Sequence, residues 1–291
     1  MFATSLMVFS KGTTLSRFLD GKLLAFDVDG TILNSLGQIS SRTVRALEAA
    51  DEAGASIVLA TGRDWHGVKQ LLKEVPSISY CICVNGVEVR ARNGEIRFSQ
   101  EIDRYLAKRV IQKVRDNIPE TAFGASVDGL FVGEEIVCGF LPATDGETGT
   151  YPVRVVDDLS AELQNNVQDI VIFHKKYADD VGELYRQVLS VTSEYHDEVS
   201  IAFSGLPMLE VLPSGSGKHT GLSWLANSMS ISQSEVIAFG DNLNDLTMLE
   251  WAGLGVAMGN GAPELFHYAD QVTLTNDEDG VAVWIEKQLL E

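Results

Sequence analysis

The chain has 291 residues, of which 45% are hydrophobic, 22% charged and 8% aromatic. Its 22 Lys and Arg residues are outnumbered by 41 Asp and Glu residues, so the formal net charge is −19 at pH 7. This length is sufficient for one large domain or two modest ones with a buried core. The acidic charge and the lack of a Lys/Arg-rich run exclude nucleic acids and anionic membrane surfaces as expected partners.

The three cysteines and the N-terminal residues bear on the cellular compartment of the protein. Cys81, Cys83 and Cys138 are an odd number without a CxxC pair, which argues against disulfides or a zinc site and favours a reducing, cytoplasmic compartment. The longest apolar runs have the length of strands, so no segment is expected to span a membrane. Residues 1–10 have no charged region before their apolar stretch, so a secretory signal is not expected. We expect an irregular terminus, with an organellar transit peptide as the alternative.

The first third of the chain alternates predicted strands and helices. Residues 22–28 form a continuous apolar run that ends in acids, as a strand buried on both faces does. Next come a helix that begins at Ser40 or Ser41 and stops at Gly54, a strand over 55–60, a helix around 68–72 and a strand over 80–84. This order predicts a parallel sheet with helices on its faces.

The pattern changes after Gly86 and returns near residue 213. Between them we predict a hairpin turned at Asn93-Gly94, helices over 103–117 and 180–192, and strands over 169–173, 199–203 and 208–212. Beyond them we predict helices over 218–229, 244–251, 263–268 and 280–290 and strands over 235–239, 255–258 and 272–274. The expected fold is a doubly wound, mostly parallel α/β core formed by residues 1–86 and 213–291, with an inserted α+β domain over residues 87–212.

Two acids follow the first predicted strand. Residues i and i+2 of an extended segment point the same way, so the carboxyl groups of Asp27 and Asp29 can face one small volume. Gly30 then allows a sharp turn. Two buried acids side by side need a shared cation or protons, and Mg²⁺ prefers carboxylates, carbonyls and water. An acidic turn after a strand is the alternative interpretation of this motif alone.

A second acidic group, residues 240–245 (Gly-Asp-Asn-Leu-Asn-Asp), also lies between a strand and a helix. Carboxyl ends of parallel strands meet at one sheet edge, so Asp241 is expected near Asp27. Helix capping accounts for one or two of these side chains but not for the whole cluster. At the same edge, Thr61 and the N–H groups after it could receive an anion, and Lys218 could balance the carboxylates and hold a phosphate.

Four groups of residues, taken in order, resemble the four motifs of the haloacid dehalogenase-like (HAD) phosphatases: Asp27-Val28-Asp29-Gly30-Thr31, Ala60-Thr61-Gly62-Arg63, Lys218, and Gly240-Asp241-Asn242-Leu243-Asn244-Asp245. The insertion between the second and third motifs resembles the C2-type cap of the Cof-type branch, subfamily IIB. Two flanking segments are also similar to that branch, Val84-Asn85-Gly86 and Asn276-Asp277-Glu278-Asp279-Gly280-Val281-Ala282. The resemblance covers residues 22–291 and implies a Rossmann-like core with a cap.

The resemblance also implies a role for each motif residue. Asp27 would attack phosphorus to give an aspartyl-phosphate, and Asp29 would protonate the leaving oxygen and then deprotonate the attacking water. Mg²⁺ would be held by the Asp27 carboxylate, the Asp29 backbone carbonyl and Asp241. The phosphoryl oxygens would be bound by Thr61, the Gly62 amide, Lys218 and Asn244. Asp245 would orient Lys218 or metal-bound water, and Arg63 would brace its motif or contact the cap.

The expected function is therefore a Mg²⁺-dependent phosphatase for a small phosphorylated metabolite, with sugar phosphates as the leading class. Two alternatives stay open, a phosphomutase or phosphotransferase with the same aspartyl-phosphate, and a phospho-ligand sensor without turnover. Specificity is expected in cap loops, between residues 124 and 150 or near 173–176. A phosphate-binding P-loop over residues 215–220 is rejected because Leu212 stands where its first Gly is required. A calcium loop beginning at Thr275 is disfavoured because its leading acid is missing.

Overall fold

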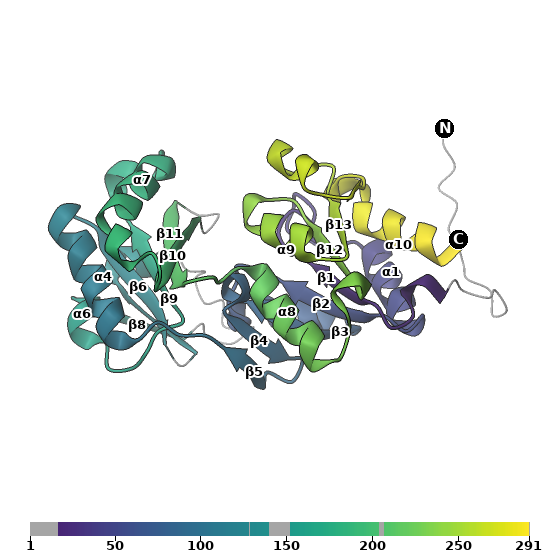
Figure 1. Cartoon of the computed structure of the whole chain (residues 1–291), viewed down its shortest axis with the longest axis horizontal. Helices are drawn as coiled ribbons and strands as arrows, with labels where there is room; N and C mark the ends of the chain where they lie inside the picture. Colours follow the sequence, from purple (N-terminus) through teal and green to yellow (C-terminus); the bar gives the residue numbers. More distant parts are fainter. Residues whose placement is uncertain (1–16, 128, 140–151, 204–206, 291) are drawn as a thin grey trace.

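The computed structural model describes residues 17–127, 129–139, 152–203 and 207–290. Within these ranges the chain forms an eight-stranded sheet of order β14-β13-β12-β1-β2-β3-β4-β5 and a six-stranded sheet of order β10-β11-β9-β6-β7-β8. Each sheet has its own helices, and the two units lie side by side in an elongated molecule (Figure 1). The larger unit is the core and the smaller one is the cap, as the sequence predicts.

The core sheet contains β1 (Leu23–Phe26), β2 (Ser56–Ala60), β3 (Ile78–Cys83), β4 (Glu88–Ala91), β5 (Ile96–Ser99), β12 (Val236–Gly240), β13 (Leu254–Ala257) and β14 (Gln271–Val272). Six of these strands, from β14 to β3 in the sheet order, pair in parallel. Only β4 and β5 are antiparallel to their neighbours. The predicted mostly parallel sheet is therefore confirmed.

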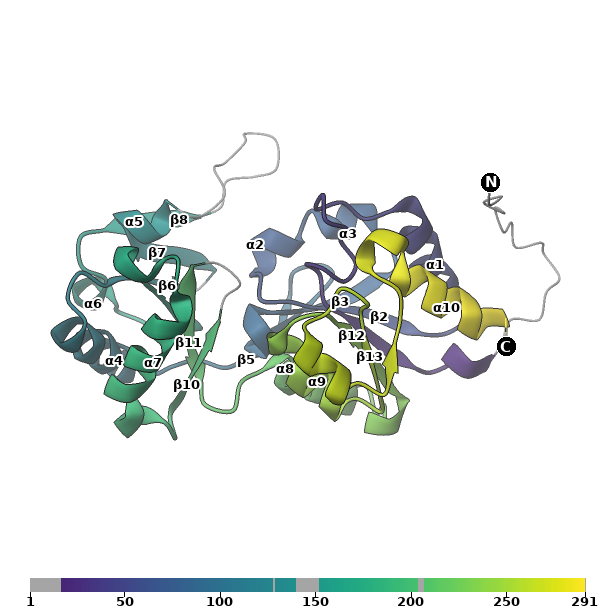
Figure 2. The same ribbon diagram turned by 90° about the horizontal axis from the view of Figure 1, so that it is seen from above.

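Helices cover both faces of the core sheet (Figure 2). On one face lie α1 (Ser41–Glu52), α2 (Trp65–Val68), α3 (Leu71–Glu74) and α10 (Gly280–Leu290), and on the other α8 (Lys218–Ser228) and α9 (Leu246–Trp251). Alternation along β1 explains the division, because Leu24 and Phe26 pack with the α1 face and Leu23 and Ala25 with the α8 face. The described helices are too short or too polar to cross a membrane.

The cap sheet contains β6 (Ala122–Val127), β7 (Leu130–Glu134), β8 (Val153–Val156), β9 (Asp169–Phe173), β10 (Val199–Phe203) and β11 (Met208–Pro213). One face is covered by α4 (Arg104–Asn117), α6 (Leu159–Glu162) and α7 (Val181–Val191), which build the larger apolar cluster of the cap. A smaller cluster on the other face includes α5 (Glu135–Cys138). The cap loop expected to set specificity includes residues 128 and 140–150, which lie outside the described residues.

Short 3₁₀ turns connect these elements: η1 (Arg17–Leu19), η2 (Val84–Gly86), η3 (Lys175–Tyr177), η4 (Ser193–Tyr195), η5 (Gln233–Glu235), η6 (Leu243–Asp245), η7 (Pro263–His267) and η8 (Asn276–Glu278). Two local expectations differ from the structure. The helix expected around residues 68–72 is divided into α2 and α3, and Gly67 inside α2 disfavours a longer helix. The segment expected at 263–268 is a 3₁₀ turn that begins with Pro263.

The hairpin β4–β5 pairs with the core sheet, whereas the sequence analysis assigned residues 87–98 to the inserted domain. Only the turn η2 and Val87 separate β3 from β4, so the chain returns beside β3 in the antiparallel sense. Val87 and Val89 of this segment are fully buried in the core clusters. The apolar pattern of the hairpin therefore belongs to the core, and the chain reaches the cap only after β5.

Truncation of Phe239 tests this description of the core. The Phe239 ring stacks on Phe26 with a centroid distance of 4.7 Å and meets the edge of Trp284 at 5.1 Å. We expect Phe239→Ala to lower the free energy of unfolding by about 3–5 kcal/mol, because it removes a buried ring and leaves a cavity. Urea unfolding measures this value. Phe266→Ala is the matched control, since Phe266 is 39% exposed, and equal losses in both variants would contradict the assignment.

Candidate active site

The buried ammonium group of Lys218 lies at the centre of the site. Lys218 begins α8 and is 0% exposed, and its Nζ donates to Oδ1 of Asp27 and, at 2.5 Å, to Oδ1 of Asp245. Asp27 directly follows β1, and Asp245 ends the turn η6 after β12. Because β1 and β12 are parallel neighbours, their carboxyl ends deliver both acids to the same place.

Asp241 directly follows β12 and reaches the same place, where the turn at Gly30 leaves room for its carboxylate. Gly30 has a φ of +85°, and a Cβ atom there would lie 2.2 Å from Oδ2 of Asp241. The hydroxyl of Thr31 donates to Oδ1 of Asp241 at 3.0 Å. Carboxylate oxygens of Asp27, Asp241 and Asp245 lie within 4.8 Å of one another. The structure therefore brings together three of the four acids expected at this sheet edge, whereas the expectation that the Asp29 carboxylate faces the same small volume is wrong, because that carboxylate is paired with Arg63.

These three acids outnumber the single cation among them. Burial raises the pKa of Asp27 well above its ordinary value although Lys218 opposes the shift, and burial together with the charge of Asp245 raises the pKa of Asp241 to about 6. Burial lowers the pKa of Lys218, but the charges of Asp245 and Asp27 more than offset this and the net shift is upward. The site therefore disfavours full ionisation of its acids, and a further cation would stabilise their charged forms.

The three acids differ in their hydrogen-bond partners. Asp245 accepts the Lys218 ammonium on Oδ1 and the backbone N–H groups of Asp241 and Asn242 on Oδ2, at 3.0 and 2.9 Å. Its carboxylate is thus occupied by protein donors. Asp27 accepts from Lys218 and Asp241 from Thr31, each through Oδ1, and the Asp27 and Asp241 side chains also interact with each other. Carboxylate oxygens gathered in this way fit a hard ion such as Mg²⁺.

Asp29 lies apart from the cluster. Its side chain is 60% exposed and forms a bidentate ion pair with Arg63, with Nη2 to Oδ1 at 2.6 Å and Nε to Oδ2 at 2.8 Å. Arg63 also donates from Nη1 to the Gly67 carbonyl at 3.2 Å. Arg63 therefore braces the first motif through Asp29. This contact is not predicted from sequence, because neither residue has a local pattern that identifies its partner.

The remaining motif residues meet at the ends of β2 and β12. Thr61 is buried, and its hydroxyl accepts the backbone N–H of Arg63 at 3.1 Å. Nδ2 of Asn244 donates to Oδ1 of Asn85 at 3.1 Å. A Cβ atom at Gly62 would lie 3.2 Å from Nδ2 of Asn85. Asn85 was singled out in the sequence only as part of a flanking segment, yet it contacts residues on two motifs.

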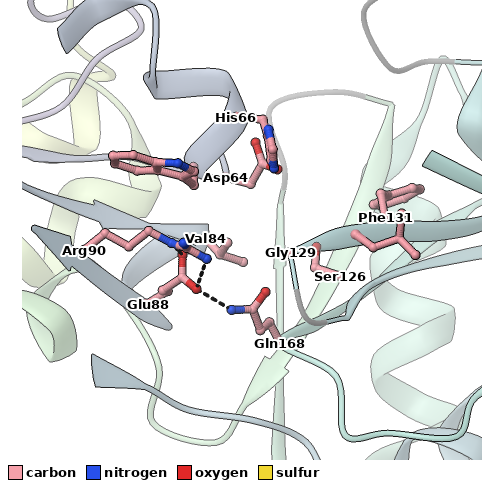
Figure 3. A pocket seen from close by; sticks show the side chains of 11 residues that line it. Asp64, His66, Val84, Glu88, Arg90, Ser126, Gly129, Phe131 and Gln168 are labelled. Atoms are coloured by element: carbon pink, nitrogen blue, oxygen red, sulfur yellow. Dashed lines mark hydrogen bonds and ion pairs between the residues drawn. The ribbon is translucent and has the colours of Figure 1, made fainter. Parts of the chain in front are cut away.

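A pocket lies at the junction of core and cap (Figure 3). The core contributes Asp64, Trp65, His66, Val84, Glu88 and Arg90, and the cap contributes Ser126, Gly129, Leu130, Phe131 and Gln168. Glu88 forms a bidentate ion pair with Arg90 and accepts a hydrogen bond from Nε2 of Gln168 at 2.7 Å. This buried carboxylate therefore connects core and cap, and no motif in the sequence indicated it.

Glu210 is a second buried acid at the junction that the sequence analysis did not assign. It lies on β11 of the cap, is 7% exposed, and accepts a hydrogen bond from Nδ2 of Asn85 at 2.7 Å. Burial, together with the charge of Asp169, raises the pKa of Glu210 to about 8. Burial likewise raises the pKa of Asp169 to about 6. In the folded protein Glu210 therefore holds its proton into the neutral range.

Removal of the Lys218 ammonium tests the charge arrangement. We expect Lys218→Met to lower the free energy of unfolding at neutral pH by about 3–5 kcal/mol, because Asp27 and Asp245 are left buried without a cation. Urea unfolding in the presence of a chelator measures this loss. The Lys218→Met/Asp245→Asn double variant should recover part of it, since one unpaired charge is removed. A single variant as stable as the wild type would contradict the account.

Glu210 predicts a pH dependence of stability. An unfolded glutamate loses its proton near pH 4.5, whereas folded Glu210 keeps it to about pH 8. Between these values the folded state binds one more proton, so stability contributed at low pH is lost as the pH rises. We expect wild-type stability to fall relative to Glu210→Gln between about pH 5 and pH 8 in urea unfolding. Asp169 and Lys218, which also face Glu210, are present in both proteins. Parallel profiles would contradict the prediction.

Comparison with known proteins places this geometry in a family. The family model described as haloacid dehalogenase-like hydrolase matches residues 24–285. The putative phosphatase YxeH of Bacillus subtilis (strain 168) is 32% identical over 276 residues, which are 92% of this chain and 98% of that protein. The chloroplastic endoribonuclease YBEY of Arabidopsis thaliana is 30% identical over 266 residues, 88% of this chain, but the chain spans only 44% of that protein.

Solved structures show the same architecture. A haloacid dehalogenase-like hydrolase from Bacteroides thetaiotaomicron is 30% identical with a TM-score of 0.75, covering 91% of this chain and 98% of that one. A HAD subclass IIB sugar phosphatase is 24% identical with a TM-score of 0.74, covering 91% and 98%, and shares the fold. With motifs, fold and family model in agreement, the chain belongs to the haloacid dehalogenase-like hydrolase family.

Proposed function

We propose that the chain is a Mg²⁺-dependent phosphatase that hydrolyses small phosphate monoesters through an aspartyl-phosphate on Asp27. The observation that carries this proposal is the buried cluster in which Lys218 contacts Asp27 and Asp245, with a carboxylate oxygen of Asp241 within 4.8 Å of theirs. Such an arrangement combines a carboxylate nucleophile, a fixed cation for phosphoryl oxygens and a pair of acids for a metal.

The metal would be held by the Asp27 and Asp241 carboxylates and the Asp29 backbone carbonyl. When bound, Mg²⁺ would supply charge neutralisation for the transferring phosphoryl group. Lys218, Thr61, the Gly62 amide and Asn244 would hold the phosphoryl oxygens, with Asp245 orienting Lys218. This division of roles is supported by the hydrogen bonds of Asp245, because one of its oxygens accepts from the Lys218 ammonium and the other from the backbone N–H groups of Asp241 and Asn242.

The chemistry would proceed in two displacements at phosphorus. An Asp27 oxygen attacks phosphorus while the bond to the leaving oxygen breaks, and Asp29 gives that oxygen its proton. Water then attacks the aspartyl-phosphate, Asp29 takes the proton of the water, and phosphate leaves with Asp27 restored. Because Asp29 is paired with Arg63, its carboxyl group must separate from the guanidinium to act on the leaving oxygen.

The cap supports recognition of the leaving group. We propose sugar phosphates as the substrate class, for which the cap would exclude bulk water and contact the leaving group. One relative from Bacillus subtilis (strain 168) is named 5-amino-6-(5-phospho-D-ribitylamino)uracil phosphatase, and another from Citrobacter koseri is named HMP-PP phosphatase.

We place the cap between about residue 101 and residue 212, because β4 and β5 pair with the core sheet. The three unpaired thiols support a cytoplasmic location.

Replacement of the nucleophile is the decisive test of this function. We expect the wild type with Mg²⁺ to release phosphate from at least one ester in a panel of sugar phosphates and other small monoesters. Asp27→Asn should reduce that rate by at least about a thousandfold, since an amide is a poor nucleophile. A chelator should have a similar effect, reversed by added Mg²⁺.

Asp51→Asn is the matched control, because Asp51 is an exposed acid at the far end of α1 and should retain full activity. If the wild type releases no phosphate from any ester, the proposal is wrong, and retained phosphate binding would then favour a sensor. Transfer of the phosphoryl group to a second sugar rather than to water would indicate a phosphotransferase or phosphomutase.

A further inference from the structure

The turn η2 contacts the residues proposed to bind phosphate. The backbone N–H of Asn85 donates to the Thr61 carbonyl at 3.0 Å. Its side-chain amide lies against Gly62, where a Cβ atom would come within 3.2 Å, and it accepts a hydrogen bond from Asn244 at 3.1 Å. Asn85 adopts a φ of 49°, a backbone region that asparagine tolerates better than most residues. One asparagine therefore contacts three of the four proposed phosphate-binding residues.

The same turn also lies against the fourth of them. Gly86 has a φ of +96°, and a Cβ atom there would lie 1.9 Å from the Gly217 carbonyl oxygen and 3.1 Å from Cα of Lys218. No other residue type fits this close approach without movement of the backbone. The turn η2 is consequently packed against the start of α8, and its position is linked to that of Lys218.

The amide of Asn85 is held from two sides. Its Oδ1 accepts from Nδ2 of Asn244 at 3.1 Å, and its Nδ2 donates to Oε2 of Glu210 at 2.7 Å. Rotating this amide by half a turn would place its NH₂ group against the NH₂ group of Asn244. Asn85 and Glu210 are both buried, so loss of one partner leaves the other unsatisfied and away from water. As the acceptor for Nδ2, Glu210 therefore favours this orientation of Asn85, in which Oδ1 of Asn85 faces Nδ2 of Asn244.

Glu210 belongs to the cap, so its hydrogen bond with Asn85 crosses the junction between core and cap. It lies on β11, 125 residues from Asn85 in sequence. A second buried hydrogen bond crosses the same junction with the same length, from Gln168 to Glu88 at 2.7 Å. Glu88, however, is paired with Arg90 on its own strand rather than with a residue proposed to bind phosphate. The two bonds are thus comparable in burial and length, and only the first leads to Asn244.

We propose that Asn85 and Glu210 are positioning residues that orient Asn244 toward the phosphoryl group, so that the affinity for phosphate depends on the placement of the cap strand β11. This inference rests on the proposed function, because it assumes that Asn244 contacts phosphoryl oxygens. It adds a coupling between cap and core, since any movement of β11 away from the turn η2 removes the hydrogen bond that orients Asn85.

The test measures phosphate binding separately from leaving-group recognition. The Mg²⁺-loaded protein is titrated with inorganic phosphate by calorimetry, and kcat and KM are measured with acetyl phosphate, whose leaving group is small. Both are done at about pH 9, where Glu210 is ionised and cannot donate a proton to the carboxylate of Asn85→Asp. We expect Asn85→Asp and Glu210→Leu to weaken phosphate binding by about tenfold and to lower kcat/KM by a similar factor. Gln168→Leu, which breaks the comparison bond, should change both values less than about threefold.

Paired substitutions distinguish orientation from general damage. Glu210→Gln keeps an acceptor oxygen of nearly the same size and should retain phosphate affinity. In the Asn85→Asp/Glu210→Gln double variant, the introduced glutamine amide can donate to the introduced carboxylate, whose other oxygen still accepts from Asn244. We therefore expect the double variant to recover most of the affinity that Asn85→Asp alone loses. Thermal unfolding of every variant confirms that each is folded under the assay conditions.

The outcomes separate this inference from the proposed function. If the wild type binds phosphate but hydrolyses no ester, the proposed phosphatase function is wrong. The phosphate affinities of the variants still test whether Asn85 and Glu210 orient Asn244. The inference is overturned if Asn85→Asp and Glu210→Leu bind phosphate as the wild type does. It is also overturned if Gln168→Leu weakens binding as strongly as they do, or if the double variant shows no recovery over Asn85→Asp.

Discussion

The site depends on one buried ammonium group. Lys218 is fully removed from water, and a charge in that position is stable only with compensating anions. Asp27 and Asp245 supply them, each at the carboxyl end of one of two neighbouring parallel strands. The strand order β12-β1 is therefore what brings these charges together, and residues separated by 191 positions form one ion pair. Asp241 then adds a further negative charge beside them, which an additional cation would balance.

The contacts between core and cap lie next to the same cluster. The chain leaves the cap strand β11 at Pro213 and enters α8 at Lys218 after the short connection 214–217, and the turn η2 packs against the start of α8. Asn85 in this turn contacts Glu210 of the cap and Asn244 of the core. The residues proposed to hold phosphate and the cap strand β11 are thus adjacent in space. In the proposed enzyme, closure over a substrate and binding of its phosphoryl group would use the same contacts.

Sequence patterns predict the parts of this structure that depend on local order along the chain. Asp27, Thr61 and Asp241 follow apolar runs of strand length, so their common edge can be inferred from the order of residues alone. The pairing of β4–β5 with the core could not be predicted in this way, because a hairpin has the same pattern in either unit. The Arg63–Asp29 and Asn85–Glu210 pairs were missed for a related reason. Partners 34 and 125 residues apart share no local signature.

The central claim is that the carboxylate of Asp27, held beside Lys218, becomes phosphorylated during turnover. The most direct measurement mixes the Mg²⁺-loaded protein briefly with a substrate, stops the reaction with acid and analyses the peptides by mass spectrometry. The account predicts a phosphoryl group on the peptide that contains Asp27, attached to that side chain and lost on mild alkaline treatment. Phosphate release without any modified peptide, or with the phosphoryl group on another residue, would contradict it.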